Sequence, residues 1–128
     1  MKRRNQSQLE ERREYTRYPA DLRVQLLRSD TIPIQLHTVE LSEGGMHVEC
    51  DRAQAQLLAP PSIGEGQQFT ARIMLIEPGM KRRALTLSAI VKTTQELGQD
   101  HYRVGLHFDR FFGKSRVLLD EFILALKN

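Results

Sequence analysis

Apolar and polar residues alternate along most of this chain, and that period of two constrains the fold more than any other feature. Between Leu22 and Phe108 the alternation occurs in six short segments separated by turn-forming residues. Successive side chains of a strand point to opposite faces, so each segment predicts a strand with one buried face. The predicted strands cover residues 22–27, 34–41, 46–50, 69–76, 83–93 and 102–108.

The connections between these segments favour tight turns in an antiparallel sheet. Ser42-Glu43-Gly44-Gly45 separates the second and third segments, while Pro78-Gly79 and Gly98-Gln99-Asp100 follow the fourth and fifth. Glycine, proline and short polar residues are the usual components of such turns. The long connection over residues 51–68 has no alternation and can hold one short helix at Gln54–Leu58.

The last part of the chain changes to a helical period. Leu118, Phe122 and Leu126 recur every four residues, and Ser115 precedes them at a position that suits a helix N-cap. We expect this amphipathic helix to close an open end of the sheet, although its apolar face would also suit a partner. Six short strands and a terminal helix predict an all-β domain, a six-stranded antiparallel β-barrel over residues 19–128.

Residues 1–18 are polar and lack apolar periodicity, so they predict a flexible N-terminal arm. The first 17 residues contain six Lys/Arg and three acids, a charge of +3 that equals the net charge of the chain. The other 111 residues contain 13 charges of each sign and are neutral. A basic arm on a neutral domain indicates a local anion site and argues against a broad nucleic-acid surface.

Composition is typical of a single globular domain from a reducing compartment. The chain is 40% hydrophobic and 27% charged. Cys50 is the only cysteine, so no internal disulfide can form, and we expect it to be a small core residue. No segment approaches the roughly 18 apolar residues of a membrane span, and the basic start lacks the apolar run of a signal peptide. We therefore expect a cytoplasmic protein.

Three arginines of the arm are the first candidate binding residues. Arg12, Arg13 and Arg17 lie within six residues, just before Pro19 and the first predicted strand. A guanidinium group is always charged, and its planar set of donors fits phosphate oxygens or the O6/N7 edge of guanine. The alternative interpretation is a solvated basic tail.

The turn Glu40-Leu41-Ser42-Glu43-Gly44-Gly45 is the second candidate. The hydroxyl of Ser42 and the amides of Gly44 and Gly45 can hold an anion, and bare glycine lets a ligand approach the backbone. The alternative is a tight hairpin in which glycine only supplies a positive φ.

Together the two motifs resemble the PilZ domain. That family has an Arg-x-x-x-Arg pair in an N-terminal arm and Asp/Asn-x-Ser-x-x-Gly at a strand turn. Here they correspond to Arg13-Glu14-Tyr15-Thr16-Arg17 and to the Glu40–Gly45 turn, and Val104-Gly105-Leu106-His107-Phe108 is similar to the family's last strand. The resemblance covers about residues 12–126 and implies a barrel that binds cyclic di-GMP, a bacterial second messenger with two guanines and two phosphates.

The resemblance also implies a role for each matching residue. Arg13 and Arg17 match the arginines that grip phosphate and the guanine edge, and Ser42 and Gly45 match the turn residues that contact the ligand. Arg12 matches an extra arginine of members that hold a stacked pair of ligands. The implied protein is a sensor or adaptor whose arm orders over the ligand and signals to a downstream protein, which the sequence does not identify.

Glu40 departs from the family pattern, which has Asp or Asn at this position. Its carboxylate still accepts hydrogen bonds from guanine, but it lies one methylene further out. Such a displacement can remove a hydrogen bond worth about 1.5–3 kcal/mol with a charged partner. We therefore expect weakened binding, and a PilZ-fold interaction protein that does not bind nucleotide remains the alternative.

Other functions have less support in the sequence. Ser42 lacks the surrounding glycines and the nearby base of a hydrolase nucleophile, so we expect no enzyme. The four histidines lack metal-site spacing, so we expect no metal and no cofactor beyond the ligand. A small barrel that binds RNA or single-stranded DNA would need a stacking platform, and several of the aromatic residues fall at core positions.

Overall fold

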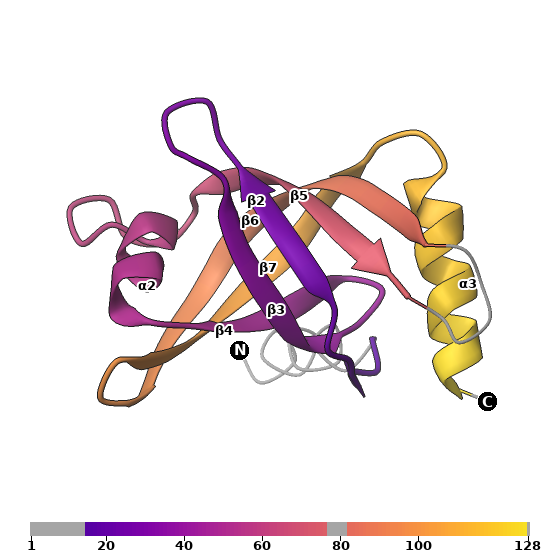
Figure 1. Cartoon of the computed structure of the whole chain (residues 1–128), viewed down its shortest axis with the longest axis horizontal. Coiled ribbons are helices and arrows are strands. Elements are labelled where there is room, and N and C mark those ends of the chain that lie inside the picture. The colour runs from indigo at the N-terminus through magenta and orange to yellow at the C-terminus, as the bar shows by residue number, and fades with distance from the viewer. Residues whose placement is uncertain (1–14, 77–81, 128) are drawn as a thin grey trace, which may run out of the picture.

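Six antiparallel strands curve into a closed barrel (Figure 1). A seventh, very short strand pairs with the end of one of them. The structure is a computed structural model, and it describes residues 15–76 and 82–127. The order in the sheet is β1-β3-β2-β5-β6-β7-β4, and pairing of β3 with β4 closes the barrel. The strands are β1 (Tyr18–Pro19), β2 (Arg23–Leu27), β3 (Ile34–Leu41), β4 (Gly45–Cys50), β5 (Gln68–Leu75), β6 (Arg83–Gly98) and β7 (His101–Phe111).

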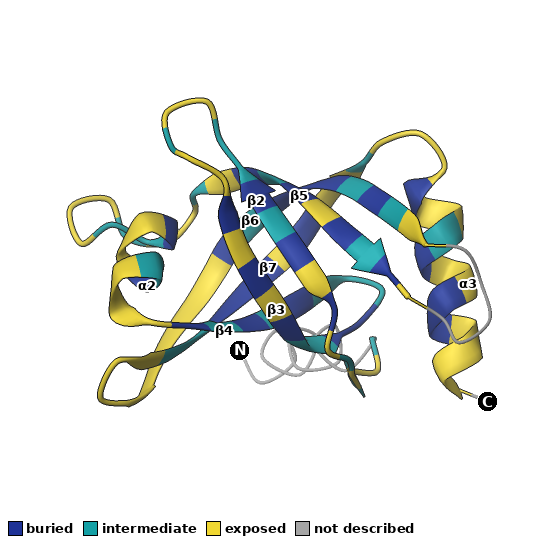
Figure 2. Ribbon diagram, in the orientation of Figure 1, coloured by how far each residue is buried: buried dark blue, intermediate teal, exposed yellow. Residues whose placement is uncertain are grey.

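The barrel interior contains the apolar residues that the alternation predicted. Buried and exposed residues alternate along β2, β3 and β5 (Figure 2). In β6, Leu85, Leu87, Ala89 and Val91 are completely inaccessible to solvent. Cys50 is also buried, as predicted, and burial followed by the charge of Asp51 raises the pKa of its thiol to about 11.

Two strands are longer than the sequence predicted. The strand predicted to end at residue 93 continues to Gly98, and β7 spans His101–Phe111 where 102–108 was predicted. Beyond Val91, β6 pairs only with β7, so the two strands form a ribbon that extends past the barrel. Every residue of β6 from Lys92 to Gly98 is exposed. Because neither face of that segment of β6 is buried, the apolar–polar alternation that marks the other strands is absent there.

Helix α2 (Arg52–Leu58) covers one end of the barrel (Figure 1). It starts two residues earlier than predicted because Asp51 caps it. The Asp51 carboxylate accepts from the Gln54 N–H at 2.8 Å, and the Gln54 side chain accepts from the Asp51 N–H at 3.0 Å. Its buried residues, Ala55 and Leu58, contribute to the barrel core.

Helix α3 (Ser115–Lys127) covers the opposite end, where Leu119, Phe122 and Ile123 join the core (Figure 1). The prediction that Ser115 caps this helix is wrong. Ser115 is its first residue, and the buried hydroxyl accepts a hydrogen bond from the backbone N–H of Thr86 in β6 at 2.9 Å. The hydroxyl therefore fixes the helix to the sheet. Leu126 lies on the predicted apolar stripe but is exposed.

The predicted turn at Pro78-Gly79 lies outside the described residues. Neither described helix has both the length and the apolar content that crossing a membrane requires.

Candidate functional site

The β3–β4 turn is held by the side chain of Ser42. The Ser42 N–H donates to the Gly45 carbonyl at 2.9 Å, which closes the hairpin. The Ser42 hydroxyl oxygen accepts from the N–H groups of Gly44 and Gly45 at 3.2 and 3.1 Å. The two amides that the sequence suggested for an anion are thus occupied by a neighbouring hydroxyl. Both bonds are longer than the usual N–H···O distance of about 2.9–3.0 Å.

Gly45 is required by a close approach of two strands. A Cβ atom at this position would lie 2.5 Å from the backbone oxygen of Leu106 in β7. The turn is also bonded to β7, because the Phe108 N–H donates to the Gly44 carbonyl at 2.9 Å. Strand β7 therefore fixes the position of the turn.

The described end of the arm lies on this turn. Strand β1 pairs with the end of β3, with Tyr18 opposite Leu41 and Pro19 opposite Glu40. The ring of Tyr15 covers Gly44, since a Cβ atom there would lie 2.7 Å from Cδ2 of the ring. The two sequence motifs, 23 residues apart from Arg17 to Glu40, therefore meet at one place on the barrel.

Arg17, Glu40 and His47 form a charged cluster beside the turn. Glu40 and His47 are opposite each other in the β3–β4 register, and His47 Nδ1 is 3.4 Å from Glu40 Oε2. Burial lowers the pKa of His47, and the positive charge of Arg17 lowers it further, whereas Glu40 acts in the opposite direction. Arg17 directly precedes Tyr18, which is opposite Leu41, so this part of the arm lies beside the strand end that carries Glu40.

His47 was considered in the sequence only as a metal ligand, and its actual role depends on strand pairing. It is opposite Gly105 of β7, and a Cβ atom at Gly105 would lie 3.1 Å from His47 Nε2 and would collide with the Thr93 hydroxyl of β6. The His47 ring therefore extends over bare backbone of β7. Gly105 is a residue of the predicted last strand, but the sequence alone does not show which side chains cross over it.

The structure brings five of the seven predicted site residues together at the turn or next to it. Arg12 and Arg13 lie outside the described residues. The five described residues are Arg17, Glu40, Ser42, Gly44 and Gly45. No cluster of three metal-ligating side chains is found in residues 15–76 and 82–127.

Comparison with known proteins identifies the family. The sequence pattern of the PilZ domain matches residues 11–125. The chain belongs to the PilZ domain family. The resemblance drawn from the two motifs is thus confirmed, and so is the six-stranded antiparallel barrel with a C-terminal helix. No curated protein matches the chain.

Solved structures of other proteins have the same fold. MotI (DgrA), the inhibitor of motility from Bacillus subtilis, is 23% identical with a TM-score of 0.64, and the match covers 90% of this chain and 51% of MotI. K. pneumonia MrkH in its c-di-GMP complex is 16% identical with a TM-score of 0.68, covering 88% of this chain and 50% of MrkH. The PilZ domain of Escherichia coli YcgR with c-di-GMP is 19% identical with a TM-score of 0.58, covering 91% and 92%.

These identities show the fold alone. The chain spans about half the length of MotI and MrkH. Two of the compared proteins, YcgR and MrkH, are solved with c-di-GMP bound, so the fold is one that binds this nucleotide in other proteins.

Proposed function

We propose that this PilZ domain is a sensor without catalytic activity that binds cyclic di-GMP at the β3–β4 turn, and that its N-terminal arm closes over the ligand. The contact between the arm and the turn is the observation that supports this most directly. Tyr15 covers Gly44 and β1 pairs with the end of β3, so the chain approaches the turn from Arg17. Guanidinium groups held at this point suit a ligand with two phosphates and two guanines.

Ser42 can donate a hydrogen bond to the ligand and still hold the turn. Its hydroxyl proton now faces the Gly45 carbonyl at 3.3 Å, a long and weak bond, while its oxygen accepts from two amides. Rotation of the hydroxyl proton towards a phosphate oxygen would exchange that weak bond for a charge-assisted one, which is roughly twice as strong as a neutral hydrogen bond. The amides would continue to hold the Ser42 oxygen in place.

Part of the entropy cost of closing the arm is already met in the unbound chain. Ordering a residue costs about 1–2 kcal/mol, and residues 15–19 already contact the barrel through Tyr15 and β1. We expect Arg12 and Arg13 to contact the ligand, and the change in the arm on binding to be the signal to a downstream protein.

Titration calorimetry with cyclic di-GMP tests the proposal. We expect wild type to bind, and Arg13→Ala and Arg17→Ala to weaken binding at least about tenfold, since each loses charge-assisted bonds worth about 1.5–3 kcal/mol. Arg23→Ala is the matched control, because Arg23 is an exposed arginine of β2, a strand that does not form the turn, and it is opposite His37, five residues before Ser42. Absence of binding by wild type would refute the proposal.

An interaction protein that does not bind nucleotide is the second candidate, and Glu40 is the observation that favours it. Its carboxylate faces His47 in the unbound protein and is one methylene longer than the family's residue. We expect Glu40→Asp to tighten cyclic di-GMP binding severalfold, because it restores the reach of the PilZ pattern. If neither wild type nor Glu40→Asp binds, and a partner is retained without nucleotide, the second candidate is correct.

A further inference from the structure

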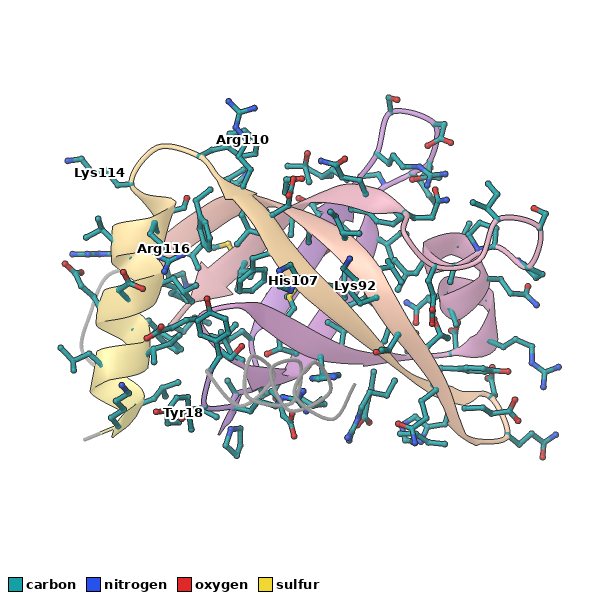
Figure 3. All side chains as sticks on the ribbon, turned by 180° about the vertical axis from the view of Figure 1, so that it is seen from behind. Tyr18, Lys92, His107, Arg110, Lys114 and Arg116 are labelled. Atoms are coloured by element: carbon teal, nitrogen blue, oxygen red, sulfur yellow. The ribbon has the colours of Figure 1, made fainter. Side chains whose placement is uncertain are left out.

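The side chains of Lys92 and His107 lie next to the turn, although neither residue belongs to a predicted motif. His107 of β7 is opposite Gly45 of the turn on one side and opposite Ile90 of β6 on the other. Lys92 is two residues beyond Ile90 on β6. Figure 3 shows Lys92 and His107 next to each other on the outer surface of these strands, away from Arg110, Lys114 and Arg116 near α3.

A β-bulge explains why β6 presents a lysine here. The register changes from Val91 opposite Leu106 to Thr93 opposite Gly105. Lys92 is therefore an extra residue that is not paired with any residue of β7. Val91 points into the core, whereas Thr93 lies over Gly105 on the outer face with His47. The bulge puts the exposed Lys92 beside them, and bulges commonly redirect a side chain in this way.

Gly45 and Gly105 face this outer surface between the turn and Lys92. The Thr93 hydroxyl and the His47 ring lie over Gly105. Glu40 and His47 lie on the β3 side of these two glycines, and Lys92 and His107 lie on the β6 side. We call Lys92 and His107 the far wall.

Lys92 and His107 are available for an anion. Neither has a hydrogen bond or ion pair with a side chain in the described part of the protein, and both are exposed. Other surface histidines differ in this respect, because His37 contacts Asp21 and His101 contacts Glu49. An ammonium group and an imidazole without an acidic side-chain partner suit phosphate, to which lysine binds as a point charge.

We infer that Lys92 and His107 form the far wall of the ligand site and bind a phosphate of cyclic di-GMP that the arm and the turn do not hold. The inference rests on the proposed function. His107 is one strand spacing from Gly45 of the turn, and β6 is one spacing further, at about 4.8 Å each. A ligand with two phosphates can therefore contact the far wall while the turn holds its other phosphate.

Calorimetry on single variants tests this wall. We expect Lys92→Ala and His107→Ala each to weaken cyclic di-GMP binding about five- to tenfold, and Lys92→Glu to weaken it further because it places a repelling charge at the wall. Lys114→Ala is the matched control, an exposed lysine near α3 where no contact is expected, and its effect should be below twofold.

The outcomes separate the two proposals. If wild type binds and both Lys92→Glu and His107→Ala bind equally well, the far wall is refuted and the site at the turn remains. If wild type does not bind, the proposed function is refuted and the wall with it. Both positions are exposed, so unchanged thermal unfolding should show that the variants are folded.

Discussion

Gly45 and Gly105 are needed for different physical reasons, and substitution to alanine should separate them. At Gly45 the new Cβ would meet a backbone oxygen of β7, which cannot move without breaking the β4–β7 pairing. We expect Gly45→Ala to lower the free energy of unfolding by about 2–3 kcal/mol, the upper part of the range for overpacking. At Gly105 the obstacles are the Thr93 hydroxyl and the His47 ring, which can rotate, so about 1 kcal/mol is expected.

Urea denaturation measures both effects, and Gly98→Ala is the control. Gly98 lies at the end of β6 with no atom within 4 Å of the added Cβ, so a change within about 0.5 kcal/mol is expected. Equal losses at Gly45 and Gly105 would contradict the distinction between a fixed backbone atom and movable side chains.

The pKa of His47 reports whether Arg17 lies at the turn. Burial and the Arg17 charge hold this pKa below its ordinary value. Arg17→Gln should therefore raise it, but only in part, because burial is the larger cause. Titration followed by NMR measures the pKa, and Arg23→Gln is the control. An unchanged pKa in Arg17→Gln would mean that the arm does not approach the turn in solution.

The lowered pKa of His47 also determines in which direction the stability of the fold changes with pH. A histidine whose pKa is lower in the folded state favours the neutral form on folding. Its contribution to stability is complete above the unfolded pKa of about 6.5 and is lost as the pH falls through the folded value. Glu40 opposes this loss, since its charge stabilises the protonated ring.

Residues of the candidate site were predictable only where their contacts lie within a short segment. Ser42, Gly44 and Gly45 bond to one another within four residues, so the turn could be found in the sequence. His47, Gly105 and Lys92 come together only through the β4–β7 and β6–β7 pairings and a bulge. No local pattern specifies that register, and these residues were missed.

At the scale of elements, burial of one face decided what could be predicted. Strands β2, β3 and β5 alternate because each has one face in the core. Residues 92–98 of β6 have no buried face, and β1 has two residues and exists because it pairs with β3. Both were missed because tertiary pairing, rather than hydrophobic pattern, forms them.

The attachment of α3 to β6 should depend on one buried hydroxyl. Ser115 is buried and accepts from the Thr86 N–H, so Ser115→Ala leaves that donor without a partner. We expect the free energy of unfolding to fall by about 1–3 kcal/mol, the cost of an unsatisfied buried donor. Chemical denaturation measures it, with Ser62→Ala in an exposed turn as the control. An unchanged stability would show that the hydroxyl does not anchor the helix.

At the scale of the whole molecule, the closed barrel links the candidate site to the rest of the fold through β7. This strand holds the turn through Phe108 and Gly44, pairs with β6 along its length, and leads directly into α3. Helix α2 follows the end of β4 that is away from the turn, and it covers the other end of the barrel (Figure 1). Ligand binding at the turn should therefore stabilise some segments and leave others unchanged.

Hydrogen exchange followed by mass spectrometry can map these segments. At saturating cyclic di-GMP we expect slower exchange at residues 15–19 and 42–45, which form the arm contact and the turn, and no change in α2. The reason is that exchange slows only where bound ligand reduces local opening. In Arg13→Ala, we expect the ligand to slow exchange less at residues 15–19, while exchange in the turn is still slowed. If calorimetry shows binding while residues 15–19 exchange as before, the arm does not close over the ligand, and the signal to a partner must leave through β7 instead.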